Sequence, residues 1–410
     1  MTAVAEPVDT TGRRFPQWAV LLVASLVGIV LFTLVLAAFT TGGLVTATQQ
    51  TANALSLGAI YALVALGYTM VYGIIELINF AHGDVFMLGA FMAMTFLTAG
   101  FGAVPGGEGA TTTGIIVGVA ALGGLGFFLG WGLISGLGIR RALPRVIAMA
   151  AVVLSVGAIE IGVGQSGAIT DPVLLTALLI PTFVVAMVIM AAINVTIERL
   201  AYRPFRHASR LAPLITAVGV SFILQNIVQL WQGTGDRGSP QVFPLIKFEL
   251  LGAQVNVLNL FILILALAIM AGLQTFVGRT RLGRAMRSTA QDQQAAQLMG
   301  VDLNQTISIT FLIGGALAGA AGVFQGLYFG YVRFDLGFNA GLKAFTSAVL
   351  GGIGNLTGAV LGGFVIGFVE VFAGAIGQQR WSQAVVFVVL ILVLLFRPSG
   401  ILGQQLGDRA

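Results

Sequence analysis

The residues most able to do chemistry lie in one short stretch between two long apolar runs. Within Ile74–Asp84 the sequence places Glu76, Asn79, His82 and Asp84, with no lysine or arginine among them. Carboxylates, an amide and an imidazole at this spacing can exchange protons, bind a cation or bind a polar solute. This stretch is therefore the first candidate for a functional site.

Patterns typical of catalysis or metal binding are missing from the sequence. His82 and His207 are the only histidines and lie on different connecting segments, and there is no cysteine. No His-Glu-x-x-His pair, phosphate-binding loop or serine elbow is present. Glu160 and Glu370 have no matching acid or base nearby in the sequence. We therefore predict no enzyme activity, no metal ion and no cofactor for this chain.

The composition requires that most of the chain faces lipid. Hydrophobic residues make up 57% of the sequence and charged residues 9%, with a mean hydropathy of +0.99. Soluble domains carry about 25% charged residues, because their surfaces face water. The net charge of +5 comes from basic residues scattered between apolar runs, which does not indicate a nucleic-acid partner. The predicted fold is an all-α, polytopic transmembrane helical bundle.

The apolar runs predict about eleven membrane spans, because each crossing needs about 20 apolar residues. The runs are Trp18–Thr40, Asn53–Gly73, Asp84–Gly102, Gly114–Gly138, Val146–Gly167, Val173–Thr196, Leu211–Gln232, Asn256–Val277, Thr306–Tyr331, Gly341–Ala375 and Trp381–Phe396. The first run is too long for the core of a cleaved signal peptide, so we interpret it as a retained span.

Basic residues on alternate connectors predict the orientation. One set of connectors holds 15 of the 20 basic residues: Arg13, Arg14, Arg140, Arg141, Arg145, Arg199, Arg203, Arg206, Arg210, Arg279, Arg281, Arg284, Arg287, Arg397 and Arg409. The other set holds Arg237, Lys247, Arg333, Lys343 and Arg380. An excess of lysine and arginine marks the cytoplasmic side. Both chain termini are therefore predicted to be cytoplasmic.

The glycine-rich run Gly341–Ala375 must make either zero or two net crossings to fit this orientation. We predict a broken re-entrant hairpin with its turn at Ile353–Gly358, inside the membrane or near it. Glycines spaced four residues apart also predict close helix packing, because small residues let helix backbones approach each other in lipid. The predicted packing glycines are Gly315, Gly319, Gly322, Gly354 and Gly358.

The longest polar connector on the predicted cytoplasmic side is Gly278–Gln305. Its part Arg284–Gly300 is rich in helix-forming residues and ends in glycine, which predicts a short helix. Such a helix could lie flat on the membrane surface or could dock into the groove of a partner protein. The residues alone favour the surface helix slightly.

The polar stretch that contains Asn79 has two interpretations in a membrane bundle. In the simpler one it is a short cytoplasmic loop, and Asp84 is the N-cap of the next helix. In the other it is a break in a helix at membrane depth, where a helix N-terminus presents free N–H groups to a substrate carboxylate. The residue types alone favour the loop slightly.

Several motifs in a fixed order resemble the high-affinity branched-chain amino-acid permeases of ABC importers. They are Leu55–Gly73 running into Ile78–Met87, Glu198–Pro204, Leu211–Thr216, Leu298–Asp302, Lys343–Phe345 through Gly351–Gly354, and Leu395–Gly403. The resemblance covers about Gln50–Gly100 and Val173–Gly403. It implies an inner-membrane subunit that works with a homologous second permease, two cytoplasmic ATPase subunits and an external substrate-binding protein, and the ATPase subunits would use the ATP.

The resemblance also assigns roles to residues. It favours a translocation pathway at the break, formed by Asn79, Phe80, His82, Gly83 and Asp84. It identifies the polar connector as the coupling helix that seats on an ATPase, with contact residues Arg284, Arg287, Asp292, Ala295, Ala296 and Gly300. It divides the chain into an extra tail and span (1–49), a first permease segment (50–100), an inserted transmembrane hairpin (101–172), the permease core (173–403) with its coupling helix at 278–304, and a tail (404–410).

Three alternatives remain at this point. A urea or short-chain amide permease would have the same architecture, because the external binding protein sets much of the selectivity. A secondary transporter driven by an ion gradient would need more buried, paired carboxylates. A purely structural membrane scaffold would need neither the polar break nor a docking helix.

Overall fold

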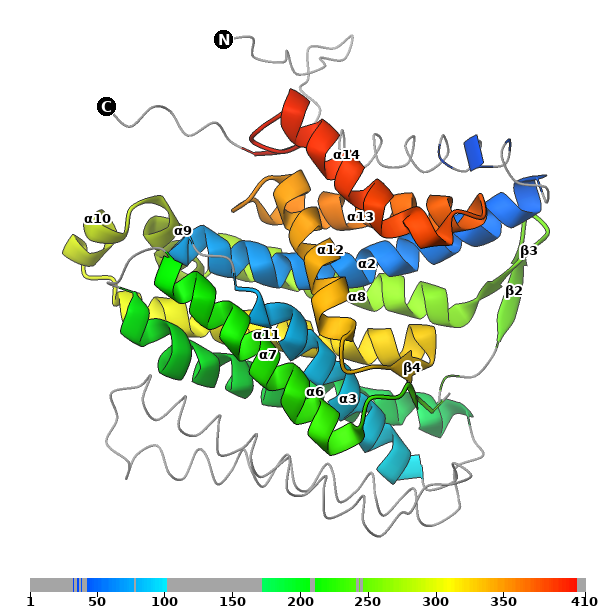
Figure 1. The fold of residues 1–410 in the computed structure, drawn as a ribbon, viewed down its shortest axis with the longest axis horizontal. Coiled ribbons are helices and arrows are strands. Elements are labelled where there is room, and N and C mark those ends of the chain that lie inside the picture. The colour runs from blue at the N-terminus through cyan, green and yellow to red at the C-terminus, as the bar shows by residue number, and fades with distance from the viewer. Residues whose placement is uncertain are drawn as a thin grey trace.

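A computed structural model of the chain describes residues 43–76, 79–101, 172–206, 211–240 and 246–403, together with residues 32, 35, 36, 38 and 243. This part is a bundle of apolar helices with two short β ladders (Figure 1). The predicted spans Gly114–Gly138 and Val146–Gly167, most of Trp18–Thr40 and the 404–410 tail lie outside the described residues.

Each of the other eight predicted apolar runs forms a helix or a pair of helices. They are α2 (Gly43–Ile75), α3 (Ala81–Phe101), α6 (Pro172–Ile197), α7 (Leu211–Gln232), α8 (Val257–Arg279), α11 (Leu303–Phe329), the pair α12 (Leu336–Gly351) and α13 (Leu356–Ala375), and α14 (Ser382–Phe396). Among the described residues seven helical segments are long and apolar enough to cross a membrane, and α3 and α12 are not among them. The predicted all-α polytopic membrane bundle is confirmed for this part of the chain.

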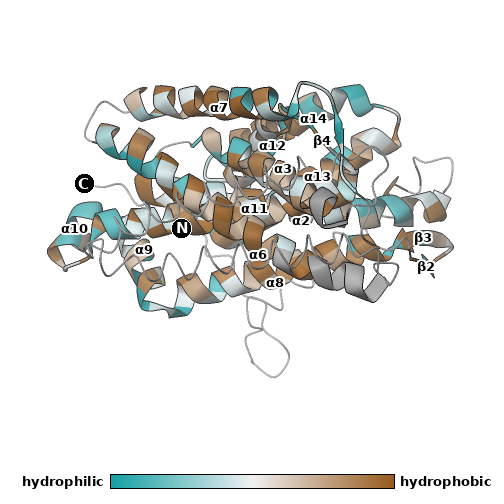
Figure 2. Ribbon diagram, turned by 90° about the horizontal axis from the view of Figure 1, so that it is seen from below, coloured by the Kyte–Doolittle hydropathy of each residue, from teal (hydrophilic) through white to brown (hydrophobic). Residues whose placement is uncertain are grey.

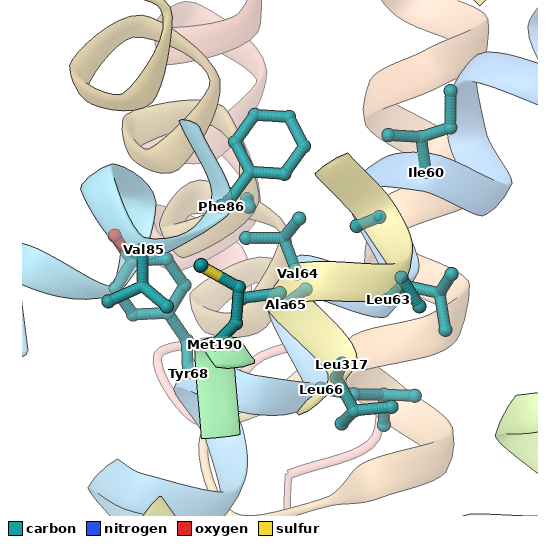
Figure 3. Packing of buried hydrophobic residues seen from close by; sticks show 14 of the residues in the cluster. Ile60, Leu63, Val64, Ala65, Leu66, Tyr68, Val85, Phe86, Met190 and Leu317 are labelled. Carbon is teal, nitrogen blue, oxygen red and sulfur yellow. The ribbon is translucent and has the colours of Figure 1, made fainter. Parts of the chain in front are cut away.

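Helix α2 is the central element of the bundle. It is apolar on all its faces, and a helix of that kind is stable only when neighbours or lipid cover every side. Helices α11, α12 and α13 pack along it, and most of its residues after Ala54 are buried. Figure 3 shows its Val64 beside Phe86 of α3 and Met190 of α6. The core is therefore formed around α2 by apolar packing.

The connectors separate to the two ends of the bundle, as the charge pattern predicts. At one end lie α9 (Arg281–Gln291) and α10 (Gln293–Leu298), which are polar in Figure 2. At the other end β1 (Arg237–Gly238) pairs with β4 (Tyr331–Val332), and β2 (Lys247–Leu250) pairs with β3 (Ala253–Asn256). We call these the α9 end and the β end. Successive connectors therefore lie alternately at the α9 end and at the β end.

The predicted re-entrant hairpin differs in detail from the structure. Two helices are present, but α12 begins at Leu336 and leads from the β end to a turn at Gly352–Asn355, after which α13 leads back. The turn lies at the α9 end, where the Asn355 side chain donates to the Leu402 carbonyl at 2.8 Å. Positive φ angles at Gly352 and Gly354 form the turn. This segment therefore forms two helices joined by a turn at the α9 end, and α12 begins beside α3 within the bundle.

The glycines predicted to pack helices have different environments. A Cβ atom at Gly319 would lie 2.6 Å from the Ala186 carbonyl oxygen of α6, and one at Gly322 would lie 2.6 Å from the Phe86 carbonyl oxygen of α3. Gly315 and Gly358 likewise lie against the backbones of α6 and α12. Gly354 is the exception, because it lies in the turn with nothing near its Cβ position. There glycine is required by the positive φ of 87°.

Candidate functional site

The chain breaks between α2 and α3, and α3 begins inside the bundle. Helix α2 ends at Ile75, and α3 begins at Ala81. On α3, Asp84 Oδ1 accepts a hydrogen bond from Gln225 Nε2 of α7 at 3.0 Å. Gln225 lies 14 residues after the first residue of the 22-residue α7, which is about 21 Å along the helix at 1.5 Å per residue. The first turn of α3 therefore lies beside the interior of α7, away from its ends.

Polar side chains from four helical segments converge on this break. We call the group the polar junction, and it consists of Tyr68, Asn79, His82, Asp84, Tyr202 and Gln225. Tyr202 follows α6 in a π-helical segment, Glu198–Tyr202, and its hydroxyl donates to Asn79 Oδ1 at 2.6 Å. The His82 ring meets the Tyr68 ring edge to face, with centroids 4.8 Å apart. Asn79, His82 and Asp84 are all buried.

The interpretation of Asp84 as the cap of the next helix is wrong. Helix α3 begins three residues earlier, at Ala81, and the His82 N–H donates to the Asn79 carbonyl at 3.1 Å. Asp84 lies one turn into the helix, where its negative charge faces the positive end of the helix dipole. Its position is buried, as the alternative of a break within the bundle requires.

Three glycines bring α3 and α12 into direct backbone contact at the junction. A Cβ atom at Gly341 would lie 2.8 Å from the Gly83 Cα atom and 3.0 Å from the Tyr68 hydroxyl oxygen. A Cβ atom at Gly337 would lie 2.7 Å from Asp84 Oδ1. Because Gly337 is the second residue of α12, the N-terminal turns of two helices meet here. Both contribute positive dipole ends, which attract an anion such as a carboxylate.

Some buried polar atoms of the junction have no hydrogen-bond partner among the described residues. These include Asp84 Oδ2 and Asn79 Nδ2. The ion pairs of the described residues also leave out Asp84. A buried polar atom without a partner costs about 1–3 kcal/mol, so such groups in a native protein call for a ligand, water or a second conformation. The junction thus offers both an acceptor and a donor to a polar solute.

Aromatic side chains close the junction towards the α9 end. The Phe345 ring of α12 lies 6.0 Å from Tyr68 and 6.3 Å from Phe80 between ring centroids. Beyond them a cavity of about 10 Å³ lies between α2 and α12, lined by Tyr68, Thr69, Tyr72, Phe345, Ala348 and Ile353. That volume holds about one water molecule. Ile353 is 39% exposed in the end turn. The aromatic rings thus leave room for about one water molecule between α2 and α12.

The polar connector forms two helices, where the sequence predicts one. Asp292 has an extended backbone and caps α10, accepting from the Gln294 and Ala295 N–H groups at 2.8 and 3.0 Å. Because a residue with extended backbone cannot continue a helix, α9 ends before it. Thr280 caps α9 in the same way, accepting from the Gly283 N–H at 3.0 Å. The connector is thus an angled pair of short helices at the end of the bundle (Figure 1).

The residues predicted to couple to an ATPase are not equally available to a partner. The exposed ones are Arg284, Arg287, Asp292, Ala295 and Gly300. The Arg287 guanidinium also donates to the Val277 carbonyl of α8. Ala296 is buried within the chain. The most exposed apolar residues of the connector, Leu298 and Met299, belong to the apolar stripe of the predicted docking helix but are not among the predicted ATPase contacts. They are 88% and 85% exposed at the end of α10.

Two charged clusters were missed from the sequence. Lys343 was placed in an external connector, but it lies in α12 and pairs with Glu370 of α13, with Nζ and Oε1 2.6 Å apart. Glu198 is buried, pairs with Arg206 and accepts from the Ser308 hydroxyl at 2.7 Å. Lys343 and Glu370 come from different helices, whereas Arg206 lies eight residues after Glu198 in the segment that follows α6, and Ser308 lies in α11. Sequence spacing alone gives no signal for such pairs.

Comparison with known proteins gives one consistent result. The family model described as "Branched-chain amino acid transport system / permease component" matches residues 50–394. The chain is 36% identical over 360 residues to the high-affinity branched-chain amino acid transport system permease protein BraD of Pseudomonas aeruginosa, and equally to the permease protein LivH of Escherichia coli K12. Each alignment covers 87% of this chain and 95% of the relative.

More distant relatives include a branched-chain amino acid permease and autoinducer 2 import permeases. The autoinducer 2 import system permease protein LsrC of Klebsiella pneumoniae is 28% identical over 144 residues, which is 35% of this chain and 41% of the relative. A probable branched-chain amino acid transport permease protein of Methanocaldococcus jannaschii is 26% identical over 232 residues, which is 52% of this chain and 72% of the relative. No solved structure matches the chain. The matched residues contain the polar junction, the connector and every described helix except the last residues of α14 and the first of α2. The chain belongs to the family of permease components of branched-chain amino acid transport systems.

Proposed function

We propose that this chain is the permease subunit of an ATP-driven importer and forms the membrane pathway for branched-chain or related amino acids. The observation that carries the proposal is the family match over residues 50–394, together with relatives whose names state branched-chain amino acid transport. The described helices fit a multi-pass membrane protein. The bacterial relatives and the arginine-rich connectors support an inner-membrane location with both termini in the cytoplasm.

The polar junction is the proposed point of contact with the substrate. The N-termini of α3 and α12 meet there, which favours the carboxylate of an amino acid. Asp84 Oδ2 has no partner among the described residues and would attract the ammonium group. A branched aliphatic side chain would pass the aromatic rings of Tyr68 and Phe345. Opening requires α12 to move away from α3, because glycines hold the two backbones in contact.

The α9–α10 connector is the proposed contact with an ATPase subunit. Leu298 and Met299 present apolar surface at its tip, and water-exposed apolar side chains of this size are typical of a docking surface. Two such ATPase subunits would hydrolyse ATP, so this chain itself needs no catalytic group and no cofactor. A homologous second permease would complete the pathway, and an external binding protein would deliver the substrate at the β end.

The experiment that tests the function is uptake of labelled leucine by cells with and without this gene. Unlabelled valine, glutamate and urea serve as competitors, and ATP is depleted in a parallel sample. We expect that deletion removes the ATP-dependent part of leucine uptake and that valine, but not urea, competes with it. The matched control is a deletion strain complemented with the intact gene, which should restore uptake.

Two results would change the proposal. Unchanged leucine uptake with loss of urea or amide uptake would retain the importer and replace the substrate. Uptake that survives ATP depletion and stops when the ion gradient collapses would identify a secondary transporter. The pair of Lys343 on α12 and Glu370 on α13 is largely buried, so this second result has a group that could carry it.

A further inference from the structure

An ion pair joins three helices next to the polar junction. Lys343 Nζ of α12 lies 2.6 Å from Glu370 Oε1 of α13, and the Tyr61 hydroxyl of α2 donates to Glu370 Oε2 at 2.7 Å. The Lys343 ammonium also lies 5.7 Å from the centre of the Tyr61 ring. Both oxygens of the carboxylate therefore have partners. We call Tyr61, Lys343 and Glu370 the three-helix tie.

The tie is largely removed from water, which makes it costly to break. The side chains of Lys343 and Glu370 are 15% and 12% exposed. In such surroundings, separation of two charges leaves each of them without compensation, and removal of one partner is strongly destabilising. A solvated surface pair would hold its helices only weakly. The tie therefore fixes the position of α12 relative to α2 and α13.

The geometry of α12 connects the tie to the polar junction. Gly337 and Gly341 are four residues apart and lie on the face of α12 that contacts α3. Lys343 follows Gly341 by two residues, a rotation of about 200° at 3.6 residues per turn, so it lies on the opposite face. On α2, Tyr61 and Tyr68 are seven residues apart and share one face, with Tyr61 at the tie and Tyr68 at the junction. Helix α12 is thus held between α3 on one side and the tie on the other.

We propose that the three-helix tie is the positioning device that keeps the polar junction closed, by fixing α12 to α2 and α13 in the position in which its glycine face contacts α3. Loss of the tie frees α12 to move away from α3 and opens the small cavity between α2 and α12. The inference rests on the proposed function only where it concerns transport. The part of the inference that concerns structure alone is how often α12 separates from α3.

The test measures access to that cavity in the assembled transporter in membrane vesicles. The chain has no cysteine, so Ala348→Cys provides a single thiol on α12, at a cavity-lining position that is 3% exposed. A small water-soluble thiol reagent is applied, and the labelling rate reports opening. In this background we compare Lys343→Met with Glu370→Gln combined, the exchange Lys343→Glu with Glu370→Lys, and Tyr61→Phe. Ser56→Ala is the matched control, because it removes a contact between α2 and α8 only.

The double neutral variant should label about tenfold faster than the parent, because it lacks the tie but leaves no charge unpaired. The exchange variant should return to within about twofold of the parent, Tyr61→Phe should label about threefold faster, and Ser56→Ala should label at the parent rate. Parent rates in both the double neutral variant and Tyr61→Phe would overturn the proposal. If the double neutral variant does not fold, Tyr61→Phe alone decides.

The transport measurement separates this inference from the proposed function. Leucine uptake by the exchange variant should exceed that of the double neutral variant. If the labelling rates follow the expected order while uptake of leucine does not depend on this gene at all, the positioning role stands and the substrate assignment falls. If uptake depends on the gene but the labelling rates are all equal, the positioning role falls and the transport function stands.

Discussion

The polar junction and the α9–α10 connector contain similar residues in opposite surroundings. Each has an acidic side chain at the start of a helix: Asp84 is buried with one oxygen unpartnered among the described residues, whereas Asp292 lies in water and caps α10. Each has an important glycine, but Gly83 is packed against the α12 backbone while Gly300 has open space around it. The buried junction therefore acts through contacts between helices of this chain, whereas the exposed connector acts through a surface that a partner protein can bind.

The largest expected effect comes from substitution of Gly83, and Gly300 provides the comparison. A Cβ atom at Gly83 would collide with the Gly337 carbonyl oxygen and lie 2.9 Å from the Gly341 Cα atom. Both neighbours are backbone and cannot move alone, so Gly83→Ala should destabilise the bundle by about 3 kcal/mol. Gly300→Ala should cost only about 1 kcal/mol, from its φ of 86°. Both changes in the free energy of unfolding are measured by unfolding each purified variant in increasing concentrations of a denaturing detergent.

The same variants also test the closed state. Gly83→Ala should lower substrate uptake more than Gly300→Ala does, even after correction for the amount of folded protein in the membrane. Gly219→Ala is the control, because that glycine lies within α7 with no heavy atom near its Cβ position and a helical φ. Equal stability of the Gly83 and Gly219 variants would show that α3 and α12 are not in contact in the membrane.

The exposed tip of the connector gives the second test. Leu298→Asp should leave folding unchanged, because this side chain is 88% exposed, but it should weaken binding of the ATPase subunit by about 30-fold. The physical reason is that an apolar contact at a docking surface becomes a buried, unpaired charge. Gln297→Asp places the same charge one residue away at an exposed polar position and should weaken binding much less. Co-purification of the ATPase at graded concentrations measures both, and equal loss in the two variants would exclude a specific contact at Leu298.

The bundle could be predicted from sequence because apolar length and charge placement are local properties. Most described helices follow the apolar runs within a few residues, although α2 begins ten residues before its predicted run, and connectors that alternate in charge lie at opposite ends. The depth of a residue within the bundle depends on helices that are distant in the sequence. Whether Asn79 and Asp84 lie in a surface loop or inside the bundle depends on where α7 and α12 pack, and no spacing in the Ile74–Asp84 stretch contains that information.

The errors at the sites have the same cause. Lys343 resembles a loop residue because it follows a polar connector, and only the neighbouring Glu370 makes it tolerable inside the bundle. The break of the connector at Asp292 could have been found, since an aspartate followed by helix formers is a common helix start. The degree of exposure of Leu298 could not, because it depends on the bend at Asp292, although the sequence already placed Leu298 on the apolar stripe of a helix that could dock into a partner. The roles proposed for the residues of both sites stay predictions until they are measured.

The smallest expected effect concerns how the connector presents its tip. Asp292→Ala removes the oxygen that accepts from two N–H groups of α10, and loss of a cap costs about 1 kcal/mol. Because α10 is only six residues long, this loss should fray the helix, displace Leu298 and weaken ATPase binding by about fivefold without unfolding the bundle. Asp292→Asn retains a capping oxygen without the charge and should bind nearly as well as the parent. If Asn and Ala weaken binding equally, Asp292 acts through its charge on the partner, and the connector contacts the ATPase at its bend as well as at its tip.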